Sequence, residues 1–291
     1  MSRGRPISVV VVTRNRSHEL LRSLERLAAL PERPPLIVVD NASTDGTAEA
    51  VARVFPGVRV HRLDVNAGAA GRNVGVELAA TPYVAFSDDD SWWEPWALAR
   101  GVAHFDGAPR LGLLNGRILV GPENRLDPVC LEMRASPLPA EPGLPGPALL
   151  GFVACGAIVR REAFLQVGGF DARLGAGGEE ELLAIDLEDA GWRLAYADDV
   201  VAHHHPSTSR DPMERRRRLA RNALWTAWLR YPAGSAWRHT LQTAMLACTD
   251  DAARSGLVQA LSQLGSILDE RRPPATELAQ RLRLLETARN R

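Results

Sequence analysis

The 291-residue sequence contains no lysine, only three cysteines and no apolar run of membrane-spanning length. All 35 basic residues are therefore arginines, and 35 acidic residues balance them, which argues against a nucleic-acid partner or a bulk attraction to anionic membranes. The cysteines are far apart and lack metal-binding or redox spacing, so we expect a reducing, cytoplasmic setting. The apolar run at residues 7–12 is too short for a signal peptide or a transmembrane segment. Peripheral contact with the inner face of a membrane stays open.

The first 90 residues alternate strand-like and helix-like patterns. Residues 7–13 are β-branched at every position but Ser8, as in a strand that is buried on both faces. Further strands are expected at 36–39, 58–63 and 83–86, and helices at 17–30, 47–54 and 71–79. This alternation predicts an α/β fold with a Rossmann-like, mostly parallel central sheet flanked by helices.

The remainder of the chain is less regular. Strands are expected at 111–120, from 152 and at 200–204, and helices at 161–167 and 179–190. The proline-rich stretch 121–147 is expected to be a long loop, a functional lid rather than a linker. From residue 211 the pattern is helical. We therefore expect a main domain over 1–207, with halves 1–120 and 121–207, and a helical C-terminal extension over 208–291.

Polar residues follow four successive strands at the point where each strand ends. They are Thr13, Arg14 and Asn15; then Asp40, Asn41, Ser43 and Asp45; then Asn66, Gly68, Gly71, Arg72 and Asn73; and finally Asp88, Asp89 and Asp90. Ligands of open α/β sheets bind at the carboxyl ends of the strands, so we expect these residues to converge on one cleft. Any one of them could instead be a turn or cap residue.

The acidic run Asp88–Asp90 comes directly after a buried apolar strand. Three adjacent carboxylates repel one another and therefore favour a bound cation. Asp88 and Asp90 point the same way if the strand continues through them. A hard divalent ion held by few carboxylates commonly also binds substrate phosphates. The alternative is a solvated acidic turn.

These motifs, in this order, resemble a known family. The segments VVVVTRNRS, VVDNASTDGT and NAGAAGRNVG and the DDD run are similar to the nucleotide-sugar half of glycosyltransferase family 2, which has the GT-A fold. The segments CGAIVRREAFLQVGGFD, GEEELLAIDLEDAGWRLAY and VVAHHHPS resemble its acceptor half, so the resemblance covers residues 7–207. Members are inverting enzymes that use UDP-, dTDP- or GDP-sugars with Mn²⁺ or Mg²⁺.

The resemblance implies a role for each motif. Thr13 and Asp40 would contact the nucleobase, and Arg72 would reach the base or the diphosphate. Asp88 would hold the ribose and also belong to the metal site, and Asp90 would bind the metal beside the diphosphate. The neighbouring strand-end residues complete the nucleotide-sugar site: Arg14, Asn15, Asn41, Asn66, Gly68 and Asp89. The acceptor, which the sequence does not identify, would be a saccharide, a lipid-linked sugar or a natural product.

Glu180 would be the general base, because it matches the aspartate of the family's Glu-Asp pair. The change from Asp to Glu is a departure, and it leaves Glu179 and Glu181 eligible as well. An acidic first helical turn, favoured by the helix dipole, would explain all three without catalysis. Attack on the sugar from the face opposite the diphosphate needs one base and no covalent intermediate, so the sugar, of hexose type, would be transferred with inversion.

His203, His204 and His205 are consecutive on an expected strand, so their side chains alternate and a three-histidine zinc site is disfavoured. The resemblance makes one of them a metal ligand beside Asp90, and His204 aligns best. Arg221 and Asn222 match a recurrent pair of the family's tail helix, without an assigned role.

Other features have more than one interpretation. Trp92, Trp93 and Trp96 could stack on a sugar or serve packing, and Cys155 is read as a small buried residue. The run Arg215–Arg218 would dock the tail or face a membrane or acceptor. A homodimer stays open.

Rival functions make distinguishable demands on the sequence. A nucleotidyltransferase would require a glycine-rich loop after the first strand, but the segment TRNRS at that place contains no glycine. A dinucleotide oxidoreductase would want G-x-G-x-x-G there. A degenerate transferase that binds nucleotide sugar without turnover is the rival from another class, and the departure at Glu180 supports it.

Overall fold

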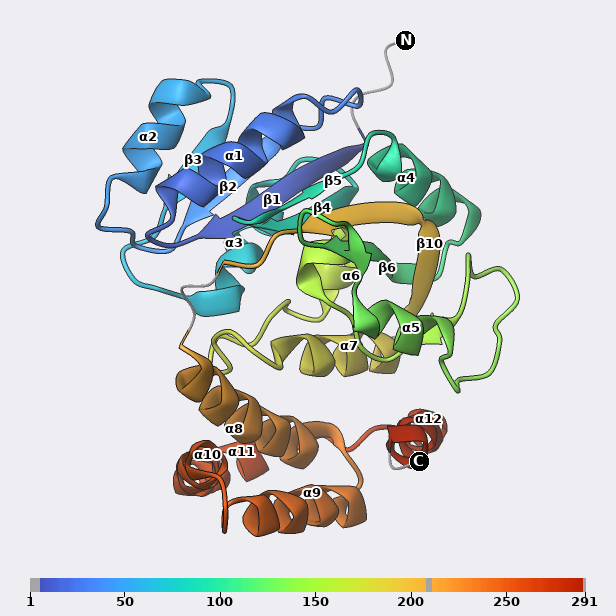
Figure 1. Cartoon of the computed structure of the whole chain (residues 1–291). Helices are drawn as coiled ribbons and strands as arrows, with labels where there is room; N and C mark the ends of the chain where they lie inside the picture. Colours follow the sequence, from blue (N-terminus) through green and yellow to red (C-terminus); the bar gives the residue numbers. More distant parts are fainter. Residues whose placement is uncertain (1–5, 208–210, 290–291) are drawn as a thin grey trace.

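Strand β1 (Ile7–Thr13) is buried on both of its faces, as its β-branched sequence requires. It lies inside a ten-stranded mixed sheet with helices on either side, and the C-terminal helices lie beneath one of these layers (Figure 1). The computed structural model describes residues 6–207 and 211–289.

The elements follow one another with few long connections. The strands are β1 (Ile7–Thr13), β2 (Leu36–Asp40), β3 (Arg59–Arg62), β4 (Tyr83–Asp88), β5 (Ser91–Trp93), β6 (Leu111–Val120), β7 (Arg125–Leu126), β8 (Ala148–Leu149), β9 (Ala157–Arg160) and β10 (Arg193–His204). The helices are α1 (Ser17–Ala28), α2 (Thr47–Val54), α3 (Gly71–Leu78), α4 (Ala97–Gly107), α5 (Pro128–Arg134), α6 (Arg161–Gln166), α7 (Glu179–Asp189), α8 (Pro212–Arg230), α9 (Ala233–Leu246), α10 (Asp251–Ser262), α11 (Leu264–Asp269) and α12 (Thr276–Arg289), with short 3₁₀ turns η1 (Gly68–Ala70) and η2 (Ala154–Gly156).

The sheet has a parallel half and a mixed half. Its order is β3-β2-β1-β4-β9-β6-β10-β5, and the pairs β3–β2, β2–β1 and β1–β4 are parallel. Strand β9 runs antiparallel to both of its neighbours, and β10 returns parallel to β6. The carboxyl ends of β1, β2 and β4 consequently lie side by side, which is the edge at which α/β folds bind ligands.

Each face of the sheet has its own hydrophobic core. One face packs against α1, α2 and α4 through residues such as Leu24, Val51 and Phe105. The other packs against α3, α5, α6 and α7 through residues such as Val76 and Phe164. Alternate residues of β1 enter opposite cores, so the sheet is the middle of three layers.

The C-terminal helices α8–α12 pack on the outer side of α7, away from the sheet (Figure 1). One apolar cluster joins Ile185 of α7 to Tyr231 and to Leu282 of α12. A second cluster joins Leu182 of α7 to Trp225 of α8. Helix α7 is therefore buried between the sheet and the extension, which explains why its apolar residues do not keep to one face.

The structure confirms the expected α/β architecture and corrects several details. The stretch 121–147 is not one loop, because it contains β7 and α5, and the side chain of Asp127 caps α5 by accepting from Val129 N. Strand β10 begins at Arg193, not at 200, and the sequence did not predict β5 or α4. Among the described residues, no helix is long and apolar enough to cross a membrane.

A buried ion cluster joins α12 to α7. Arg281 lies 2.5 Å from Glu141 and 3.5 Å from Glu188, and Arg193 is 3.3 Å from the same Glu188. The Glu188 side chain is 2% exposed. Burial raises the pKa of Glu188 to about 7 despite the two arginines. The cluster therefore places two carboxylates and two guanidinium groups where water cannot solvate them well.

We expect Arg281→Met to destabilise the protein by about 3 kcal/mol at pH 8, because Glu141 and Glu188 lose a buried partner. The loss should be smaller at pH 5.5. Glu188 has a higher pKa in the folded protein than in the unfolded chain. The stability that its proton contributes is therefore complete below the unfolded pKa and is lost as the pH rises through 7. Urea unfolding at the two pH values measures both effects. Arg283→Met, at an exposed position of the same helix, is the control. An equal loss at both pH values would contradict the account.

Candidate active site

The polar strand ends of β1, β2 and β4 meet at one edge of the sheet. Thr13 pairs in register with Asp40 of β2, and Val12 pairs with Asp88 of β4. The Thr13 hydroxyl donates to Asp89 at 3.0 Å, across 76 residues of sequence. Asp40 is fully buried, and its Oδ1 accepts from the backbone N of Ser43 at 3.0 Å. The structure therefore brings residues from three strand ends into one neighbourhood.

The acidic run does not continue as a strand, because β4 ends at Asp88 and a turn follows. The three carboxylates consequently have different partners. Asp88 pairs with Arg72 at 2.5 Å, Asp89 with Arg16 at 3.1 Å, and Asp90 approaches His204 at 3.3 Å. Burial raises the pKa of Asp89 to about 6 against the pull of Arg16, and the charges of Asp90 and Asp88 add to the rise. Negative charge is concentrated here, as a cation site requires.

Asp88, Cys155 and His204 offer ligand atoms that all lie within 4.8 Å of one another. Asp90 adjoins this group through His204. Carboxylate oxygen and imidazole nitrogen together suit Mn²⁺, and the carboxylates suit Mg²⁺. The residues present therefore fit a divalent ion. Cys155 is buried, which raises the pKa of its thiol well above the usual range, so it enters the group as a neutral neighbour.

The other two histidines lie on the far side of β10. His203 stacks on Trp92 with ring centroids 5.5 Å apart, and His205 meets the edge of the same ring at 4.7 Å. Arg26 covers Trp92 at 4.3 Å from its centroid. These four residues line a cavity of about 550 Å³ that does not include the acidic turn. Trp92 is thus engaged in packing.

The other tryptophans of this segment do not gather at the acidic turn. Trp93 is buried in the core beneath α1 and α4, whereas Trp96 is exposed with a left-handed backbone. Neither is placed as a platform beside Asp90.

Several predicted nucleotide-binding residues hold the loops of the site in place. Asn41 donates to the carbonyl of Gly68 at 2.9 Å and accepts from Ala67 N at 3.2 Å. Asn66 accepts from the backbone N of Gly68 at 3.0 Å. Asn15 accepts from Thr44 N at 2.8 Å. These bonds fix the loops after β1, β2 and β3 relative to one another.

Two charged residues of the expected set lie at the periphery. The side chain of Arg14 is exposed, and Asp45 is exposed and accepts from Thr47 at the start of α2.

Arg72 links the two halves of the molecule electrostatically. Its side chain is 9% exposed and lies beneath Asp88 at the start of α3. Burial alone would lower the pKa of Arg72, but the carboxylates of Asp88, Glu179 and Glu180 raise it. A buried guanidinium from the first half therefore interacts electrostatically with carboxylates from both halves.

The three glutamates at the start of α7 are not equivalent. The carboxylate of Glu179 is buried and accepts from the backbone N of Gly177. Glu181 accepts from the Tyr231 hydroxyl at 2.8 Å, so it faces the C-terminal extension. Glu180 is half-buried, and the charges of Arg72 and Asp88 act on it. Burial raises the pKa of Glu180 to about 8, and the negative charge of Glu179 adds to the rise.

The loops that carry these groups touch at two glycines. The backbone N of Ala69 donates to the carbonyl of Gly175 at 3.0 Å. Gly68 has φ of +58°, and a Cβ built on it would lie 2.9 Å from Cα and C of Gly175. Only a residue without a side chain allows the loop before α3 to approach the loop before α7 this closely.

Three residues near the site were not predicted from the sequence. Arg16 lies 3.1 Å from Asp89 and 3.6 Å from Asp90. Arg62, at the end of β3, lies 3.8 Å from Asp40. Cys155 was read as a buried residue, which the structure confirms, but it also adjoins Asp88 and His204. Arg16 directly follows Thr13, Arg14 and Asn15, which were predicted from the sequence to belong to the site, so its positive charge next to them could have identified it.

Comparisons with known sequences find one family model and similar curated proteins. The sequence model of the family described as glycosyl transferase family 2 matches residues 8–168. The chain is 30% identical, over 243 residues, to N-acetylglucosaminyl-diphospho-decaprenol L-rhamnosyltransferase of Mycobacterium tuberculosis, covering 71% of this chain and 78% of that protein. It is 32% identical over 229 residues to pre-mycofactocin glycosyltransferase of the same species, covering 73% of this chain and 45% of that protein.

Solved structures share the fold at low sequence identity. A mannosyltransferase from Pyrobaculum calidifontis, in complex with GDP-Man and Mn²⁺, superposes with a TM-score of 0.60 at 20% identity, over 98% of this chain and 79% of that one. S. aureus TarS in complex with UDP-GlcNAc gives a TM-score of 0.56 at 19% identity, over 75% of this chain and 66% of that one. Both likenesses support the GT-A architecture.

The contact between the two loops can be tested at Gly68. We expect Gly68→Ala to destabilise the protein by about 1–3 kcal/mol more than Gly46→Ala does. Both glycines have positive φ, so both variants carry the same kind of backbone strain, but a Cβ at Gly46 meets nothing within 4 Å. Urea unfolding of the two variants isolates the steric clash. Equal losses would show that the loops do not pack as described.

Proposed function

The chain belongs to glycosyltransferase family 2, and from this premise we propose that it transfers a hexose-type sugar, with inversion and divalent-metal dependence, from a nucleoside-diphosphate sugar to an acceptor hydroxyl. The observation that carries the proposal is that Asp88, His204 and Arg72 cluster where β4 ends, close enough for the charges of Arg72 and Asp88 to act on Glu180. A metal ligand set, a diphosphate-binding cation and a carboxylate base are what this reaction needs in one place.

Recognition of the nucleotide falls to Thr13 and Asp40. Asp40 Oδ2 is buried and accepts no hydrogen bond from the residues the structure describes. Uracil, thymine and guanine all present a ring N–H, which a buried carboxylate oxygen would accept strongly. This supports a UDP-, dTDP- or GDP-linked donor, with Arg62 beside the carboxylate to balance its charge.

The diphosphate and the ribose would lie along the acidic turn. Asp90 and His204 would hold Mn²⁺ or Mg²⁺, with Asp88 between the ion and the ribose. When bound, the ion supplies positive charge beside the diphosphate that leaves. Arg72, already buried against Asp88, adds a second cation on the side of α3. Burial strengthens this electrostatic contribution, because water does not screen it well.

Glu180 is proposed as the base that accepts the proton of the acceptor hydroxyl. Its neighbours Glu179 and Glu181 are engaged with Gly177 and Tyr231, whereas the charges of Arg72 and Asp88 act on Glu180. A carboxylate with a raised pKa binds a proton more readily than an ordinary one, which suits a general base. A single carboxylate on the acceptor side gives direct displacement, and therefore inversion at the sugar.

Glu180→Gln should lower kcat by about 10²–10⁴-fold while donor binding is retained, since the amide keeps the shape but accepts no proton. The acid limb of the wild-type pH profile should lie well above an ordinary glutamate pKa, because activity appears only as Glu180 loses its proton. Sugar transfer or donor hydrolysis, assayed with a nucleotide-sugar panel and Mn²⁺, measures both. Glu181→Gln is the matched control. Full activity of Glu180→Gln would refute this assignment.

The alternative function is a binding protein that holds nucleotide sugar without turnover. The glutamate at position 180, one methylene longer than the family's aspartate, favours it. Calorimetric binding of a donor by wild-type protein that neither transfers nor hydrolyses any donor in the panel would establish this alternative.

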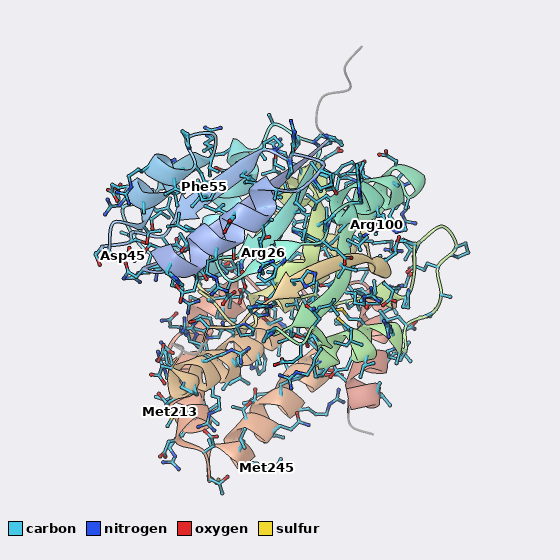
Figure 2. All side chains as sticks on the ribbon, turned by 45° about the horizontal axis from the view of Figure 1, so that its top comes forward. Arg26, Asp45, Phe55, Arg100, Met213 and Met245 are labelled. Atoms are coloured by element: carbon cyan, nitrogen blue, oxygen red, sulfur yellow. The ribbon has the colours of Figure 1, made fainter. Side chains whose placement is uncertain are left out.

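We further propose that the acceptor is presented at a lipid surface. The M. tuberculosis rhamnosyltransferase is named for an acceptor linked to decaprenol. In this chain, Trp237, Leu241 and Met245 of α9 follow one another at helical spacing with exposed fractions of 57%, 60% and 67%. Met245 lies on the outer edge of the extension, far from α2 (Figure 2). Such an apolar helix face binds lipid interfaces.

Co-sedimentation with phosphatidylcholine vesicles tests this proposal. Wild-type protein should bind, and Trp237→Ser with Leu241→Ser should weaken the partition coefficient at least about tenfold, since each buried apolar side chain contributes about 1.5–3 kcal/mol. Val54→Ser, at an exposed apolar position of α2, should have no effect. Wild-type protein that stays in the supernatant would exclude a lipid-surface site on α9.

A further inference from the structure

The segment that leads into α7 is rich in glycine and has little conformational preference of its own. We call residues 174–178 the glycine loop; it contains Gly175, Gly177 and Gly178 with φ of +70°, +110° and +83°. Three glycines in left-handed conformations have a large conformational freedom to lose on folding. The loop ends directly at Glu179 and Glu180, so its conformation decides where their carboxylates lie.

Helix α8 of the extension binds the carbonyl groups of this loop. The Asn222 amide donates to the carbonyls of Leu174 at 2.9 Å and Gly177 at 2.6 Å. Arg221 donates to the carbonyl of Leu174 at 2.9 Å and to Asn222 Oδ1 at 2.9 Å. Asn222 is fully buried and Arg221 is 8% exposed. The guanidinium thereby fixes the orientation of the amide, which in turn spans the loop.

The loop is held on its opposite side by the nucleotide half. Gly175 accepts from Ala69 N of η1 at 3.0 Å, whereas Gly177 donates its backbone N–H to Glu179 at the start of α7 itself. The carbonyls of residues 174 and 177 are thus bonded to α8, and the carbonyl of residue 175 to the loop before α3. The glycine loop is therefore hydrogen-bonded to α8 on one side and to the loop before α3 on the other.

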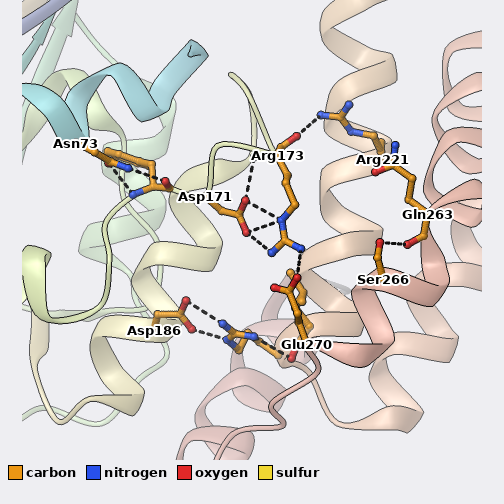
Figure 3. Close-up of polar contacts among 11 residues, drawn as sticks. Asn73, Asp171, Arg173, Asp186, Arg221, Gln263, Ser266 and Glu270 are labelled. Carbon is orange, nitrogen blue, oxygen red and sulfur yellow. Dashed lines mark hydrogen bonds and ion pairs between the residues drawn. The ribbon is translucent and has the colours of Figure 1, made fainter.

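Further polar contacts secure the same junction. Arg173, just before the glycine loop, pairs with Asp171 and lies 2.9 Å from Glu270 next to α11, while Arg221 reaches the carbonyl of Arg173 at 3.4 Å (Figure 3). Asp186 of α7, labelled in Figure 3, accepts from Nε and from Nη2 of Arg230 of α8. The extension therefore grips α7 and the segment before it.

Arg221 is an expensive residue to bury for packing alone. Among the described residues it forms no ion pair; carbonyl oxygens and the Trp225 ring, 4.5 Å from its guanidinium carbon, are its partners. Apolar residues of similar volume fill such a space at equal or better stability. What they cannot supply is the directional hydrogen bonding that fixes individual carbonyls.

We propose that Arg221 and Asn222 are positioning residues that set the place of the Glu180 carboxylate through the carbonyls of the glycine loop. The C-terminal helices then complete the active site, although they contribute no group to the reacting atoms. The inference rests on the proposed role of Glu180 as the base.

Asn222→Asp is the variant of choice, because it keeps the shape and the acceptor for Arg221 but replaces a donor with an oxygen that repels the two carbonyls. We expect kcat to fall about 10–100-fold, as misplacing a catalytic group by an ångström does, with the KM for the nucleotide sugar changed less than twofold. Thr226→Val, at a fully buried position one turn along α8, is the matched control and should leave both parameters unchanged.

A double-mutant cycle with Glu180→Gln distinguishes positioning from general damage. If Asn222 acts through Glu180, Asn222→Asp lowers kcat in the wild-type background but not further in the Glu180→Gln background. Additive losses in the cycle would overturn the inference while leaving the proposed function intact. A Glu180→Gln variant with full activity would overturn the role of Glu180 as the base, on which the inference rests, whereas wild-type protein that neither transfers nor hydrolyses any donor would overturn the proposed function itself. Should Asn222→Asp not fold, Arg221→Gln, which removes the other donors to residues 173 and 174, takes its place in the same cycle.

Discussion

A buried guanidinium among carboxylates is the constraint on which the site depends. Arg72 rises from the start of α3 against Asp88, and the charges of Glu179 and Glu180 act on it from the other half of the chain. Without a cation at this point, the acidic turn and the start of α7 would repel each other. Arg72 and Arg16 are fewer than the carboxylates around them, and in the proposed function this excess of acidic groups would favour a divalent ion beside Asp90.

The parallel half of the fold could be predicted from the sequence, because its strands and helices have separate and regular signals. Strand β1 is β-branched almost throughout, and α1 keeps one apolar face. The other half obeys weaker signals. Proline at 128 suggests a loop, yet proline is well tolerated at the first position of a helix, and Asp127 caps α5 there. Strand β5 has three residues, too few for any periodicity.

The candidate site could be predicted as a set of residues but not as a set of contacts. Strand ends place Asp40, Asp88 and Asp90 at one edge through topology alone. Which carboxylate pairs with Arg16, Arg72 or His204 depends on the turn after Asp88. The alternation of side chains along a strand does not predict this turn, because it assumes that the strand continues. The bonds from Asn222 to the glycine loop span 45 and 48 residues between elements of unlike pattern, and only the packed structure relates them.

Arg72 therefore connects the charges of the two halves, and the proposed function adds a divalent metal beside the acidic turn. Isothermal titration of UDP, dTDP and GDP into the protein, with Mn²⁺ and with EDTA, tests this claim most directly. The account predicts that one of these nucleotides binds at least about tenfold more tightly with Mn²⁺, equivalent to about 1.4 kcal/mol. Equal affinity in Mn²⁺ and EDTA, or no binding of any of the three, would contradict it.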